Sequence, residues 1–269
     1  MKIISKARKE TRNSIDFHFF VLKRLVKRRC FMFFWKKEKK FNYDKFIKKA
    51  KKFSSFELER YNEYAQYLKE NKKQAQTRKL GLKLIVISDT HGHFAFSEDR
   101  LPVFLDSVPE YDLCVLLGDI HPYDLKQIVE MIPKERILTI RGNHDEFELY
   151  EREGIKEMSG RTVSYKGATF AGVEGSFRYK DRVFPSFTQY ESLYQLEDMK
   201  RADVLLTHDC MFEHSKNEAA HTGLIGITRF IYTYAPVWHI HGHLHLSYQK
   251  DYDNGTKEKC VYLCEYMEI

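Results

Sequence analysis

Five short clusters of potential metal-binding residues occur along the chain, and each follows an apolar run. They are Asp89-Thr90-His91, Gly118-Asp119, Gly142-Asn143-His144-Asp145, the single His208, and Gly242-His243-Leu244-His245. Their carboxylates, amide and imidazoles form an oxygen and nitrogen ligand set that suits Mn, Fe, Zn, Co or Ni. Because open α/β sheets bind ligands at the carboxyl ends of their strands, we expect the clusters to converge at one sheet edge.

The segments that must position these clusters begin near residue 81. Short apolar runs alternate there with helix-like segments, which is typical of an α/β domain. Turn sequences at residues 165–167 and 253–256 predict hairpins. The sheets should therefore be mixed, with antiparallel strands near the C-terminus. Strands are predicted over residues 83–88, 113–117, 137–140, 169–173, 204–207 and 237–240, and a helix is predicted from the spacing of Leu224, Ile227 and Ile231.

The first eighty residues differ from the rest of the chain in charge. Residues 1–80 hold 25 Lys and Arg against 8 Asp and Glu, whereas residues 81–269 hold 20 against 30. Helical spacing of apolar residues predicts a basic amphipathic helix over residues 14–35, and a capping box at Ser54 and Glu57 predicts a second helix. We therefore expect a basic helical N-terminal extension, residues 1–80, joined to an acidic body, residues 81–269.

The sequence leaves three partners open for the basic extension. Its apolar stripe suits packing on the body of the protein or on a second subunit, which would make a homo-oligomer. Its lysines and arginines, with aromatic residues among them, suit binding of nucleic acid. A basic amphipathic helix also suits an anionic membrane surface.

Cysteine content and hydropathy indicate a compartment. The chain has five cysteines, with no Cys-x-x-Cys pair and no signal peptide, which predicts a reducing compartment and hence a cytoplasmic location. Lysines and arginines interrupt the apolar stretch near residues 17–35, whereas a spanning helix needs about 20 mostly apolar residues. We expect no transmembrane segment.

The order and spacing of the five clusters resemble the calcineurin-like metallophosphoesterases over residues 82–252. The resemblance implies an α/β fold with a two-sheet β-sandwich of mixed sheets flanked by helices. It also implies hydrolysis of a phosphate ester with two divalent transition-metal ions, Mn²⁺ first, with Fe, Zn, Ni or Co as alternatives. The implied ligands are Asp89, His91, Asp119 and His245 for one ion, and Asp119, Asn143, His208 and His243 for the other, with Asp119 bridging both.

The resemblance assigns catalytic roles as well. A hydroxide that bridges the two ions attacks phosphorus in line, and His144 is the implied general acid for the leaving oxygen. An imidazole suits that step because its pKa lies near neutrality. Arg141 matches an arginine that grips phosphate in the related phosphoprotein phosphatases; the alternative is an exposed surface arginine. Asp145 either orients His144 or caps the helix that follows.

One position departs from the family pattern. Many relatives continue Gly-Asp-x-x-Asp after the bridging residue, but Pro122 stands at the second Asp position in this chain. Asp124 lies nearby and is a candidate substitute. His221 either lines the phosphate pocket or belongs to the start of a helix.

Four histidines at and just before the last cluster are spaced two residues apart. His239, His241, His243 and His245 would all face one side of an extended strand, so periodicity alone does not select the ligands. The Gly-His-x-His match selects the last two. We expect His239 and His241 to be supporting or core residues.

The short matched region leaves little room for a capping domain, which favours an open site and a phosphodiester over a phosphomonoester substrate. The sequence also leaves two alternatives to this phosphodiesterase open. One is a non-catalytic scaffold of the same fold that binds proteins, and the other is a nuclease that holds nucleic acid with its basic extension.

Overall fold

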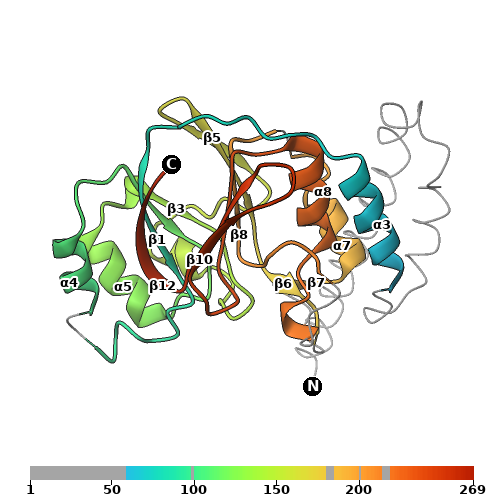
Figure 1. Cartoon of the computed structure of the whole chain (residues 1–269). Helices are drawn as coiled ribbons and strands as arrows, with labels where there is room; N and C mark the ends of the chain where they lie inside the picture. Colours follow the sequence, from blue (N-terminus) through green and yellow to red (C-terminus); the bar gives the residue numbers. More distant parts are fainter. Residues whose placement is uncertain (1–58, 98–99, 180–184, 200, 214–218) are drawn as a thin grey trace, which may run out of the picture. The chain divides into compact units, whose positions relative to one another are not determined.

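The computed structural model describes residues 59–97, 100–179, 185–199, 201–213 and 219–269 (Figure 1). The helix predicted over residues 14–35 and the capping box at Ser54 lie outside these residues. The second predicted helix is described as α3, Glu59–Glu70, which packs against α8, Ile225–Tyr234. The division of the chain at residue 80 stays a prediction.

The first sheet has four strands in the order β12-β1-β2-β3. β1, β2 and β3 run parallel, and helices α4 and α5 make the crossovers between them. β12 pairs antiparallel with β1, so that Leu263 lies opposite Ser88. The carboxyl ends of β1 and β2 therefore lie side by side. The bounds are β1 Lys83–Ser88, β2 Leu113–Leu116, β3 Ile137–Thr139, β12 Leu263–Glu268, α4 Arg100–Ser107 and α5 Pro122–Met131.

The second sheet has six strands in the order β10-β11-β9-β8-β5-β4. Its central strands β11, β9, β8 and β5 are parallel, while β10 and β4 pair antiparallel at the two edges. A small pair, β6 Ser176–Phe177 and β7 Ser186–Phe187, lies outside both sheets. The bounds are β4 Thr162–Tyr165, β5 Ala168–Val173, β8 Val204–Thr207, β9 Trp238–His241, β10 Tyr248–Asp251 and β11 Lys257–Cys260.

Alternating side chains place the two sheets face to face. Leu84 and Val86 of β1 belong to the core that also contains Phe170, Leu206 and Ile240 of the second sheet. The intervening side chains of β1 point to the other face of the first sheet, as a period of two requires. They pack there against Leu101, Leu125 and Ile128, from α4 and α5.

Helices cover the outer faces of this sandwich (Figure 1). α4 and α5 lie on one side, and α7 and α8 lie on the other. α7 begins at a capping box in which the Thr188 side chain accepts from the backbone N–H of Glu191 and the Glu191 side chain accepts from that of Thr188. The remaining bounds are η1 Lys134–Arg136, α6 Leu149–Arg152, α7 Gln189–Gln195 and η2 Ala219–His221.

The predicted fold class, an α/β sandwich of two mixed sheets flanked by helices, is confirmed. Each of the six predicted strands is present, and both predicted turns join antiparallel strands, β4 to β5 and β10 to β11. None of the helices in the described ranges has the length and apolar character needed to cross a membrane. The four cysteines in these ranges are free thiols.

We expect Gly226→Ala to destabilise the fold. α8 approaches α7 so closely that a Cβ at Gly226 would overlap the backbone carbonyl of Ser192. Relief requires a shift of one helix, which costs on the order of 1–3 kcal/mol. Urea unfolding measures the change, with Thr233→Ala in the same helix as the control. Equal stability of Gly226→Ala and wild type would contradict the close approach.

Candidate metal centre

Asp89 directly follows β1 and is fully buried. Its Oδ2 accepts hydrogen bonds from Ser88 Oγ at 2.5 Å and from the backbone N–H of His243 at 2.8 Å. Its Oδ1 is buried and has no hydrogen-bond partner among the described residues. Burial alone raises a carboxyl pKa, yet the imidazoles of His245 and His208 hold the pKa of Asp89 below its usual value. Asp89 is therefore a buried anion with one oxygen uncommitted.

Two imidazoles meet at the uncommitted oxygen of Asp89. His91 Nε2 and His245 Nε2 are 3.2 Å apart, and His245 Nε2 is 3.4 Å from Asp89 Oδ1. His91 Nε2 is also 3.9 Å from Asp119 Oδ2. Of the four ligands that the resemblance implies for the first ion, the structure groups the ligand atoms of Asp89, His91 and His245 within 4.8 Å, whereas Asp119 is grouped with Asp89 and His208.

A second group forms around Asp119, which follows β2. Asp119 Oδ2 lies 3.5 Å from His208 Nε2, and the same nitrogen is 3.0 Å from Asn143 Oδ1. Nδ1 of His208 is 2.8 Å from the carbonyl of Leu117, which assigns its N–H there and leaves Nε2 to face the two oxygens. Burial alone lowers the pKa of His208, but the carboxylates of Asp119 and Asp89 raise it to about 10. The pocket strongly favours a positive charge at this point.

His243 lies beside this group but does not join it through Nε2. Its ring centroid is 4.9 Å from that of His208, and its Nε2 is 2.9 Å from the carbonyl of Ala220. The expectation that His243 and His245 extend a strand is wrong. β9 ends at His241, and both later histidines have positive φ, 67° and 52°. They are presented by a strained loop rather than by strand alternation.

His144 is exposed beside the two groups of ligand atoms. Its ring lies edge-on to that of His91, with centroids 5.8 Å apart, and its backbone N–H donates to Asp119 Oδ1 at 2.7 Å. The backbone of His144 thus holds the Asp119 carboxylate, while its imidazole faces solvent beside the two groups of ligand atoms.

Glycines allow the loops to approach this closely. A Cβ at Gly142 would overlap Asp119 Oδ1, and a Cβ at Gly242 would overlap Ser88 Oγ. Any larger residue at either position would push a loop away from a buried carboxylate. The glycines in the clusters therefore serve packing around the acids.

Asp145 has neither of the two roles expected from sequence. It accepts from the backbone N–H groups of Asp119, Ile120 and Gly142 and from Tyr150 Oη, at distances of 2.8–3.0 Å. The following helix α6 has Glu148 as its N-cap. Asp145 instead joins the loops after β2 and β3, because it is buried where their backbone N–H groups converge.

Asp124 holds the loop that carries His91. It is fully buried in α5 and accepts from the backbone N–H groups of Gly92 at 2.8 Å and Ala95 at 2.7 Å. Pro122, which departs from the family pattern, occupies the first turn of the same helix. A proline is tolerated there because the backbone N–H that it lacks would have no partner within the helix. The carboxylate at position 124 supports the site through the backbone.

Arg141 is buried rather than a surface arginine, with only 8% of the residue exposed. Its Nε donates to Glu174 Oε2 at 2.8 Å, a terminal nitrogen lies 3.5 Å from Glu157 Oε2, and Phe147 covers the guanidinium. The exposed-surface alternative is therefore wrong. Its predicted contact with phosphate stays a prediction.

His239 and His241 are fully buried behind the site, as expected for core residues. His239 is bonded to Thr207 Oγ1 and Tyr252 Oη, and His241 to Glu258 and the carbonyl of Gly242. His221 lies in η2 with its ring 5.3 Å from that of His243.

Tyr262 is a neighbour of the site that sequence reasoning missed. Its ring stacks on His245 with centroids 5.2 Å apart, and its hydroxyl is 3.4 Å from His93 Nε2. No motif contains it, because it reaches the site through the antiparallel pairing of β12 with β1.

The donor set fits divalent transition metals. It combines imidazole nitrogens, carboxylates and an amide, and it holds a buried carboxylate oxygen without a hydrogen bond at the point where two Nε2 atoms converge. Three groups of His, Asp and Glu ligand atoms lie within 4.8 Å of one another in the described residues. Two are at this site, Asp89 with His91 and His245, and Asp89 with Asp119 and His208; the third is the buried group of His239, His241 and Glu258. The same arrangement explains why a cation would be held between these residues.

Comparison with known proteins gives one family. Residues 82–247 match the family model for calcineurin-like phosphoesterases. No curated protein matches the chain significantly.

Several solved structures are similar. Phosphopantetheinyl hydrolase of Mycobacterium tuberculosis is 13% identical, with a TM-score of 0.46 over 69% of this chain and 91% of that one. The protein TT1561 of Thermus thermophilus is 14% identical, with 0.47 over 70% and 99%. Wild-type Vps29 of Entamoeba histolytica complexed with Zn²⁺ is 14% identical, with 0.32 over 68% and 74%.

We expect Asp145→Asn to destabilise the protein more than Tyr150→Phe. The asparagine places an N–H₂ group among three backbone donors, which costs on the order of 3 kcal/mol. Tyr150→Phe removes one donor from the same carboxylate and should cost about 1 kcal/mol. Urea unfolding compares the two. An equal loss in both variants would contradict the joining role of Asp145.

Proposed function

Because this chain belongs to the calcineurin-like phosphoesterase family and is a metal-dependent phosphoesterase, we propose that it hydrolyses a phosphodiester at a centre of two divalent cations. The observation that carries the proposal is the convergence of His91 and His245 on the uncommitted oxygen of Asp89, beside Asp119 and His208. Cations held at this point would balance the buried negative charges.

The proposed ligands divide into two sets that share Asp119. Asp89, His91 and His245 hold one cation, and Asn143, His208 and His243 hold the other. Mn²⁺ is the first choice, with Fe, Zn, Ni and Co as alternatives. When bound, such cations lower the pKa of water and offset negative charge on phosphoryl oxygens.

The chain itself supplies the proton for the leaving group in this proposal. His144 is exposed beside His91, and its backbone is tied to Asp119. An imidazole held there can donate a proton from a ring nitrogen to the departing oxygen. The scaffold alternative has no need of an exposed histidine at this point, so His144 favours hydrolysis.

The preference for a diester rests on access. His91, His144 and His245 are all exposed, and the family match over residues 82–247 leaves little room for a capping domain. A phosphorus atom bearing two organic groups can approach such an open pocket.

We expect the purified full chain to bind about two equivalents of Mn²⁺. His245→Ala and Asn143→Ala should each bind about one equivalent fewer, while Asp119→Ala should lose both ions because the two sets share it. Elemental analysis after gel filtration gives the ratios, and Asp251→Asn on β10 is the matched surface control. A wild type that binds no metal after supplementation would support the non-catalytic scaffold.

The role of His144 is tested by the leaving group. His144→Ala should lower kcat for a phenyl phosphodiester about 100-fold, and much less for the matching 4-nitrophenyl diester, because 4-nitrophenolate departs without a proton. Steady-state rates with Mn²⁺ measure both. The same loss on both esters would contradict general-acid catalysis and indicate a structural effect.

A further inference from the structure

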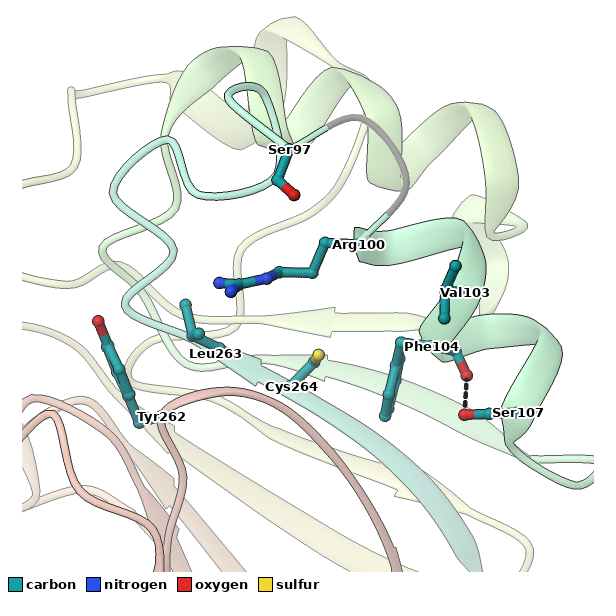
Figure 2. Close-up of a pocket in the computed structure, with 8 residues that line it drawn as sticks. All are labelled: Ser97, Arg100, Val103, Phe104, Ser107, Tyr262, Leu263 and Cys264. Carbon is teal, nitrogen blue, oxygen red and sulfur yellow. Dashed lines mark hydrogen bonds between the residues drawn. The ribbon is translucent and has the colours of Figure 1, made fainter.

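A groove adjoins the metal centre on the side of Tyr262. It lies between α4 and the start of β12, has a volume of about 480 Å³, and is lined mainly by Arg100, Val103, Phe104, Tyr262, Leu263 and Cys264 (Figure 2). Tyr262 forms its end wall and stacks on His245. The groove therefore begins one aromatic ring away from a proposed metal ligand.

The backbone also connects the groove to the metal centre. Leu263, in the groove, is the register partner of Ser88, which directly precedes Asp89. Leu263 has a positive φ of 65°, as do five proposed ligands of the metal centre. A leucine in this conformation costs about 1 kcal/mol, and such strain clusters where a chain serves binding or catalysis.

The side chains that line the groove are mostly apolar, with one positively charged side chain, that of Arg100. Val103 is 63% exposed although its side chain is apolar, and Phe104 and Leu263 continue that surface. Burial raises the pKa of the Cys264 thiol to about 11, so the thiol is neutral. Among the described residues that line the groove, Arg100 is the only charged one.

The positively charged Arg100 side chain lies between the metal centre and the apolar end of the groove. Figure 2 shows the guanidinium of Arg100 extending across the groove toward Leu263 and Tyr262, while Val103 and Phe104 lie at the opposite end. No ion pair of Arg100 occurs within the described residues. A ligand that starts at the metal centre would therefore meet Tyr262, then a positive charge, then an apolar surface.

We propose that this groove binds the organic part of the substrate, and that the substrate carries a second anionic group close to the scissile phosphate and an apolar group beyond it. Charge complementarity with Arg100 and continuity with the metal centre select this occupant. An alkyl diphosphate, which is an anhydride rather than a diester, is the simplest binding probe with this order of groups. The inference rests on the proposed function and specifies the substrate class of the same site.

The test uses four ligands and two variants of the full, Mn²⁺-loaded protein. Methyl phosphate, octyl phosphate, methyl diphosphate and octyl diphosphate are titrated by calorimetry. In wild type, the second phosphate and the octyl chain should each tighten binding about tenfold. Arg100→Gln should remove the gain from the second phosphate alone, and Val103→Asp the gain from the octyl chain alone.

Controls separate the groove from general effects. Both substituted side chains are exposed, so the variants should fold, and urea unfolding verifies this. Asp106→Asn, on the same helix outside the groove, should bind all four ligands as wild type does. Comparing proteins in one buffer cancels chelation of free Mn²⁺ by diphosphate.

Three results have distinct meanings. Selective losses in the two variants support the groove. Equal affinities in wild type and both variants overturn it, as does a loss that is the same for all four ligands. If these ligands bind as expected but no phosphodiester or alkyl diphosphate is hydrolysed, the groove stands and the proposed function fails.

Discussion

The structure depends on keeping two carboxylates ionised while they are buried a few ångströms apart. Asp89 and Asp119 end neighbouring parallel strands, and the pKa of each is lowered although burial opposes this. Isolated, such charges would take up protons, because desolvation of an anion is costly. They stay charged through backbone N–H donors and facing imidazoles, above all His208. Every loop of the site has to supply one of these compensating groups.

That requirement explains where the backbone is strained. Asp89, His91, Asp119, His243 and His245 all have positive φ, an uncommon conformation for residues with a Cβ. The loops turn sharply so that N–H groups and imidazoles face the carboxylates, and Gly118, Gly142 and Gly242 leave the space that this approach needs. Buried Asp124 and Asp145 then hold the turned loops by their own backbone N–H groups. The strain is offset by hydrogen bonds to four acids.

The sequence predicted the strands and the convergence well, because both follow from local patterns. Apolar runs identified the strands, and parallel strands force their ends to one edge. Support from tertiary contacts was not predictable in the same way. Asp145 was expected to orient its neighbour His144 or to cap the next helix, but two of its four partners, the backbone N–H groups of Asp119 and Ile120, lie about 25 positions earlier, in another loop. Tyr262 depends on the register of β12 against β1, which no residue near it reveals.

The site is divided between a buried and an exposed half, and this division orients the substrate. Asp89, Asn143 and His208 are buried and fixed by packing, so these side chains cannot move toward a ligand. His91, His144 and His245 face solvent, and the groove begins behind His245 at Tyr262. A phosphate ester must approach from this exposed half, with its phosphoryl group toward the buried acids. In the proposed mode of binding, selectivity for the organic group comes from residues outside the five clusters, so the clusters identify the chemistry without identifying the substrate.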